Sequence, residues 1–136
     1  MKRRRQFLQA GLASLVLVAL DPSETPAVLG MKTIYQKELP SLSLDGWQVT
    51  VLELTFPPGM SSPKHLHPGF VLGYILEGQL RFQLEGEQET VLSTGEVFYE
   101  APGSVHLSSG SASTARPARI LALAFGEKGK EIIKLV

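Results

Sequence analysis

The 136-residue sequence lacks cysteine altogether, which excludes disulfide bonds, thiolate zinc sites, iron–sulfur clusters and a cysteine nucleophile. It also lacks net charge, because 13 basic side chains balance 13 acidic ones. Non-specific binding to nucleic acid draws on a basic surface, so we predict no nucleic-acid partner. Aromatic residues are scarce at 7%, and the sequence has neither a glycine-rich phosphate loop nor a serine nucleophile elbow.

Turn-forming residues are frequent instead, with 13 Gly and 9 Pro spread along the chain. Between them, apolar and alternating stretches have the length and period of strands. Turns recur at roughly ten-residue intervals, which is typical of an all-β barrel or sandwich. We therefore predict a single all-β domain with a loop at 108–114 and strands around Ile34 and at 46–56, 70–76, 79–84, 90–92, 96–100, 105–107 and 118–125.

The first 27 residues differ from the rest of the chain. A basic head at 2–5 precedes an uncharged apolar stretch at 10–20, which is short for a membrane span and matches a secretory signal. Residues 4–8, RRQFL, resemble a twin-arginine export signal. We predict an export signal at 1–27, a domain at 28–136 and a periplasmic or otherwise exported protein. An uncleaved N-terminal anchor is the alternative and would be its only contact with the membrane.

Three histidines are the candidate metal ligands. His65 and His67 are two residues apart, so in a strand they point to the same face. His106 follows much later, just after a Pro-Gly turn. Spacing alone does not say whether His106 returns to the other two, and a lone His-x-His pair in an exposed loop is ordinary.

Residues 59–67, GMSSPKHLH, continuing to Gly78, resemble the first motif of the cupin superfamily. Residues 95–106, GEVFYEAPGSVH, resemble the second. The chain is most similar to small single-domain bacterial cupins of the quercetin-dioxygenase-like group. The resemblance implies a jelly-roll barrel that holds one divalent transition metal (zinc, iron, nickel, manganese or copper) through His65, His67 and His106.

The first motif departs from the family at one position with chemical consequences. The resemblance places a ligating glutamate at position 71, where this chain has valine. Losing that carboxylate removes a negative charge from the site and leaves a coordination position open. It also makes a site without metal more plausible.

Aromatic and acidic side chains near the histidines are pocket candidates, with a core role as the alternative for the aromatic ones. Tyr99 and Glu100 point to opposite faces of their strand, and the sequence does not say which faces inward. We expect Glu100 on the surface. The candidates are Phe70, Val71, Tyr74, Phe98, Tyr99 and Glu100.

The functional hypothesis is an exported cupin that binds one divalent metal and a small-molecule ligand. If it is an enzyme, the metal acts on a small oxygenated or anionic molecule, and the sequence identifies no catalytic residue. The alternative is a non-catalytic periplasmic module that binds a small ligand or the metal itself. The resemblance also implies a homodimer, with Ile34 and the tail 132–136 as candidate contacts.

Overall fold

The two longest strands are β1 (Trp47–Phe56) and β8 (Ala118–Glu127), which pair antiparallel along their whole length. β1 mixes polar and apolar residues, whereas β8 is apolar from Ile120 to Phe125 and its burial alternates from residue to residue. The structure is a computed structural model that describes residues 30–136. The predicted export signal at 1–27 lies outside these residues. All the strands lie in one unit, Ile34–Val136. The other strands are β2 (His65–Leu66), β3 (Phe70–Glu77), β4 (Gln79–Leu84), β5 (Thr90–Ser93), β6 (Val97–Glu100), β7 (Val105–Ser111) and β9 (Lys134–Leu135).

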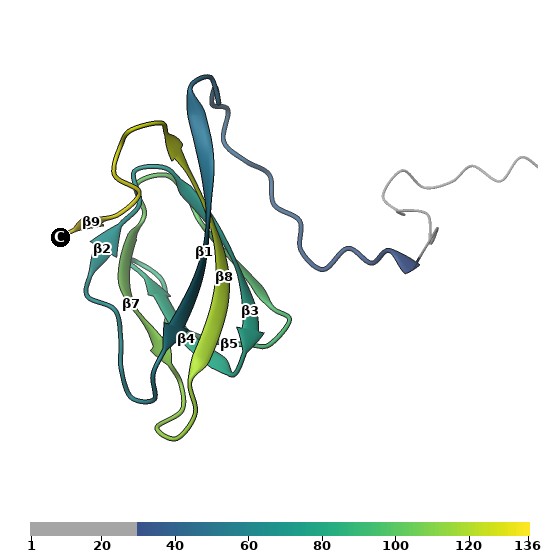
Figure 1. Cartoon of the computed structure of the whole chain (residues 1–136), viewed down its shortest axis with the longest axis vertical. Coiled ribbons are helices and arrows are strands. Elements are labelled where there is room, and N and C mark those ends of the chain that lie inside the picture. The colour runs from purple at the N-terminus through teal and green to yellow at the C-terminus, as the bar shows by residue number, and fades with distance from the viewer. Residues whose placement is uncertain (1–29) are drawn as a thin grey trace, which may run out of the picture. The chain divides into compact units, whose positions relative to one another are not determined.

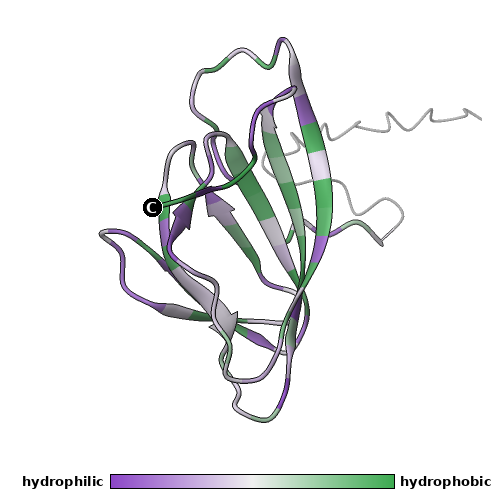
Figure 2. Ribbon diagram, turned by 60° about the vertical axis from the view of Figure 1, so that its left-hand side comes forward, coloured by the Kyte–Doolittle hydropathy of each residue, from purple (hydrophilic) through white to green (hydrophobic). Residues whose placement is uncertain are grey.

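The strands form two antiparallel sheets, as expected for a jelly roll (Figure 1). One sheet has the order β1-β8-β3-β6 and the other β5-β4-β7-β2-β9. Hydrophobic positions recur along the strands of the four-stranded sheet (Figure 2). Their inward side chains pack against those of the second sheet, since Ile75, Leu80, Phe82 and Ile120 belong to one buried cluster. The prediction of an all-β fold is confirmed.

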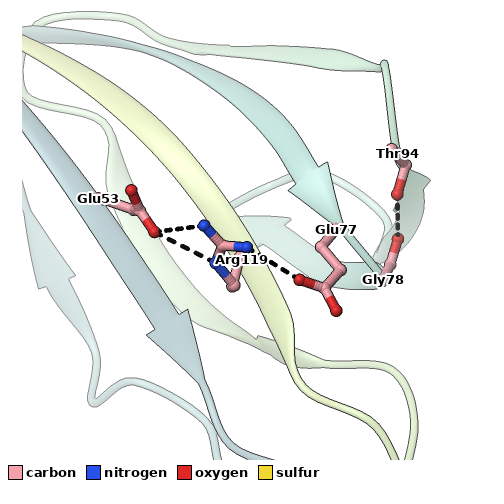
Figure 3. A network of polar contacts seen from close by, with 5 residues as sticks. All are labelled: Glu53, Glu77, Gly78, Thr94 and Arg119. Carbon is pink, nitrogen blue, oxygen red and sulfur yellow. Dashed lines mark hydrogen bonds and ion pairs between the residues drawn. The ribbon is translucent and has the colours of Figure 1, made fainter.

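Arg119 on β8 links this strand to both of its neighbours, β1 and β3 (Figure 3). Its guanidinium donates to Glu53 on β1 at 2.6 Å and to Glu77 on β3 at 3.0 Å. Next to this network, Gly78 turns the chain from β3 into β4 with φ of 74°, a conformation that favours glycine. Its carbonyl oxygen accepts a hydrogen bond from Thr94.

Two local predictions are wrong. The segment around Ile34 forms no strand, because it has no partner strand within residues 30–136, and Ile34 is 58% exposed. The predicted loop at 108–114 begins later, since β7 continues through Ser111 in register with β4. Small residues make this possible. An added Cβ at Gly110 would lie 2.7 Å from the Ser61 hydroxyl oxygen, and the adjoining Ser109 and Ser111 are buried.

The middle strand β3 is buried more completely on one face than on the other. Val71, Gly73 and Ile75 face inward and are buried, whereas Leu72 and Tyr74 on the other face are half-buried. Among residues 30–136, no helix has the length and apolar character needed to span a membrane.

Candidate metal centre

The fold brings the three histidines together. His65 lies on β2 directly opposite His106 on β7, and their ring centroids are 4.9 Å apart. His67 follows the end of β2, and its ring centroid lies 5.2 Å from that of His65. His65 and His106 are buried and His67 is nearly so. The pairing of β2 with β7 therefore returns His106 to the His-x-His pair, which spacing alone left open.

Backbone carbonyls orient two of the rings. Nδ1 of His65 lies 2.7 Å from the carbonyl oxygen of Pro63, and Nδ1 of His67 lies 2.6 Å from that of Ile132. A carbonyl oxygen only accepts, so each Nδ1 carries the proton. In the neutral imidazole this leaves Nε2 with a free lone pair. A histidine held through Nδ1 by a carbonyl, with Nε2 free, is the form that binds metal ions.

Glu100 on β6 lies among the histidines. Its Oε1 is 3.4 Å from His106 Nδ1, and its Oε2 is 3.8 Å from His67 Nε2. Its side chain is 2% exposed, so the expectation of a surface glutamate is wrong. The alternation of β6 turns Phe98 and Glu100 inward and Tyr99 outward.

The cluster carries polar groups that the protein alone does not satisfy. Among residues 30–136, Oε2 of Glu100 and Nε2 of His106 have no hydrogen-bond partner although both atoms are buried. Burial lowers the pKa of His65, and the neighbouring His106 and His67 lower it further. The hydrogen bond that His65 donates to the Pro63 carbonyl and the charge of Glu100 raise this pKa and so act in the opposite direction. His65 is thereby favoured in its neutral, ligating form.

The donor set fits a divalent transition metal. Three imidazoles and one carboxylate, buried and partly unpaired, are donors that zinc, iron, nickel, manganese and copper accept. Within the described part of the chain, no three or more such side chains are already arranged to hold an ion. Binding one therefore requires these side chains to turn toward a common point.

The cluster opens into a cavity of about 300 Å³ between the two sheets. Its wall is largely apolar, with the histidines and Glu100 as the ionisable groups that line it. Such a volume suits a small molecule. The lining residues are Leu52, Leu54, Phe56, Ser62, His65, His67, Val71, Phe98, Glu100, His106, Ser109, Ile120, Ala122, Ala124, Ile132 and Ile133.

Three of the six pocket candidates line this cavity, namely Val71, Phe98 and Glu100. The other three do not. Phe70 stacks on Phe125 with ring centroids 4.5 Å apart. The ring centroid of Tyr99 lies 6.1 Å from that of Phe70, on the same face of the sheet. Tyr74 lies on that face of β3 as well. These aromatic residues pack on the outer face of the four-stranded sheet, because strand alternation separates them from the inward set.

The C-terminal segment is a part of the site that sequence reasoning missed. Ile132 and Ile133 line the cavity, and β9 pairs with β2 beside His65. The main chain of Ile132 also holds His67. From the sequence, the apolar tail 132–136 was only a candidate dimer contact, and only the tertiary structure shows that part of it lies beside the histidines.

Comparisons with known proteins agree with this fold. The sequence model of the family described as Cupin domain matches residues 52–124. None of the curated proteins compared with the sequence matches it.

Several solved structures resemble the chain. The DMSP lyase DddQ from Ruegeria pomeroyi is 25% identical over 68% of this chain, with a TM-score of 0.54. The chain spans only 44% of that lyase. A cupin-like protein from Thermotoga maritima is 19% identical over 77% of this chain and 89% of its own, with a TM-score of 0.55. The polyketide cyclase RemF from Streptomyces resistomycificus is 22% identical over 65% of this chain and 60% of its own, with a TM-score of 0.55.

Proposed function

Because this chain belongs to the cupin domain family, we propose that it binds one divalent transition metal through His65, His67 and His106. The observation that carries the proposal is the meeting of two buried histidines, a third that is nearly buried and a buried carboxylate at the wall of one apolar cavity. Two of the rings are held through Nδ1 with Nε2 free. Histidines that bind metal ions ordinarily have this orientation.

The cavity supports a small ligand beside the metal. A bound divalent ion supplies a Lewis acid to an oxygen atom of that ligand. The apolar wall excludes water and leaves orientation to the few polar groups at the cluster. We propose a small oxygenated or anionic molecule as the ligand, in keeping with the quercetin-dioxygenase-like group that the motifs resemble.

Metal analysis tests the proposal. The mature protein, purified without chelating resin, should contain about one transition-metal ion per chain, and the His65→Ala/His67→Ala double variant should contain none. The Glu89→Gln variant, with an exposed glutamate changed, is the matched control and should retain the metal. A protein that takes up no metal even after reconstitution would refute the proposal.

Assays of the metal-loaded protein with a panel of ligands distinguish an enzyme from a binding module. A ligand panel that begins with DMSP is justified by the 25% identity to the lyase DddQ. Turnover that depends on the metal supports an enzyme. A ligand that changes the visible spectrum of the Co²⁺-loaded protein without being consumed supports the alternative of a non-catalytic module, which the apolar cavity wall also suits.

Export completes the proposal. Residues 4–8, RRQFL, resemble a twin-arginine signal, which suits export of a folded, metal-loaded domain through the twin-arginine route. Replacing both arginines by lysine should retain a fusion of the full chain in the cytoplasm. Export that persists after this change would refute the twin-arginine route.

A further inference from the structure

The inward face of the four-stranded sheet has a carboxylate next to the position where the motif lacks one. Val71 on β3 and Glu100 on β6 are direct partners in the antiparallel ladder. Both side chains line the cavity. Side chains of partners on one face lie about 5 Å apart at Cβ. A carboxylate extending from position 100 therefore enters the same part of the cavity as one extending from position 71.

The contacts of Glu100 leave room for a cation. His67 Nε2 bears a lone pair, because the proton of this ring is committed to the Ile132 carbonyl through Nδ1. The atom opposite it, Oε2 of Glu100, is also an acceptor, and 3.8 Å separates the two. Among residues 30–136 no donor reaches this oxygen. The ionisable side chains that approach Glu100 are histidines, which are charged only when protonated, rather than lysine or arginine. Glu100 Oε2 is buried and His67 is 14% exposed, and two acceptors that face each other in this way are stabilised by a proton or a metal ion between them.

We infer that Glu100 is the fourth protein ligand of the divalent ion and replaces, from the neighbouring strand, the carboxylate that Val71 cannot supply. The inference rests on the metal site proposed above. A set of three imidazoles and one carboxylate carries one negative charge into the site. It therefore binds harder ions such as Mn²⁺ and Fe²⁺ better than three imidazoles alone, whereas Zn²⁺ depends less on the carboxylate.

Metal titration of four proteins tests the assignment: wild type, Glu100→Gln, Val71→Glu/Glu100→Gln and the surface control Glu89→Gln. Mn²⁺ and Zn²⁺ affinities are measured by calorimetry, and the visible spectrum of bound Co²⁺ reports the ligand set. Glu100→Gln should weaken Mn²⁺ binding by about 10- to 100-fold, weaken Zn²⁺ binding less, and change the Co²⁺ spectrum. Val71→Glu/Glu100→Gln should recover most of the Mn²⁺ affinity, because the carboxylate returns from the opposite strand. Glu89→Gln should match the wild type.

The outcomes separate this inference from the proposed function. Wild type that binds no metal refutes both. Wild type and Glu100→Gln that bind Mn²⁺ equally and share one Co²⁺ spectrum refute only the role of Glu100. Weaker binding that Val71→Glu does not restore, with an unchanged Co²⁺ spectrum, also refutes it and makes Glu100 a positioning residue for His106. If Glu100→Gln shows no cooperative melting transition, the titrations are made on Glu100→Ala, which also removes the carboxylate, and wild-type Mn²⁺ affinity in that variant would overturn the assignment.

Discussion

The contact between Gly73 and Phe98 leads to a sharp prediction, because it joins the core to the cavity wall. Gly73 lies in β3 under the ring of Phe98 on β6. A Cβ added at Gly73 would overlap ring atoms Cζ and Cε1 and would lie 2.6 Å from Cε2. Ordinary contact begins at 3.4 Å, so the ring must retreat by at least about 0.8 Å. Phe82 blocks this movement, with its ring centroid 4.7 Å from that of Phe98.

The expected cost follows from two opposing effects. Alanine in place of glycine within a strand ordinarily stabilises by about 0.5–1 kcal/mol. Overpacking a filled core costs about 1–3 kcal/mol, and a displacement of this size in a ring packed against Phe82 belongs at the upper end. We therefore expect Gly73→Ala to lower the free energy of unfolding by about 2 kcal/mol. The melting temperature should fall by about 8–15 °C in a domain near 100 residues.

A double-mutant cycle identifies the cause. In a Phe98→Leu background the distal ring atoms are absent, so Gly73→Ala should become neutral or slightly stabilising. The coupling free energy between the two positions should be about 2 kcal/mol, measured by urea denaturation of all four proteins. Equal destabilisation by Gly73→Ala in both backgrounds would refute the overpacking argument.

Three further predictions concern charge and association. Burial lowers the pKa of His65 below its usual value of 6.5, so the unfolded chain takes up a proton that the folded chain resists. The free energy of unfolding of the chelator-treated protein should therefore be highest above pH 6.5 and fall as the pH drops below it, until His65 is charged in both the folded and the unfolded chain. A free energy of unfolding that rises on acidification through this range would contradict the lowered pKa of His65. Arg119→Gln should lower the melting temperature only slightly, because the ion pairs of Arg119 with Glu53 and Glu77 are exposed. The difference in melting temperature between wild type and variant should shrink in about 1 M NaCl. A difference that survives high salt would point to lost packing instead. Light scattering of the wild type should give twice the mass of one chain. Leu135→Asp replaces a leucine that is 72% exposed by a charged residue and should give the mass of one chain. A monomeric wild type would exclude the dimer.

Local patterns were sufficient to predict most of the fold. Strand β4 was expected at 79–84 and forms at Gln79–Leu84, because strict alternation and flanking turns define both its period and its ends. The exceptions depend on partners distant in sequence. β7 continues through Ser109 and Ser111 because β4 lies beside it, and a run of small polar residues signals a loop when that neighbour is unknown.

The sequence by itself determined the imidazole donors of the candidate site and excluded thiolate donors, since it contains three histidines, all near turns, and no cysteine. It also determined that Tyr99 and Glu100 face opposite sides, because alternation is a property of the strand. Only the tertiary structure decided which of the two faces the histidines. That choice depends on how β6 pairs with β3 and which face of the sheet the second sheet covers. Both are contacts between residues far apart in the chain, and no local pattern records them.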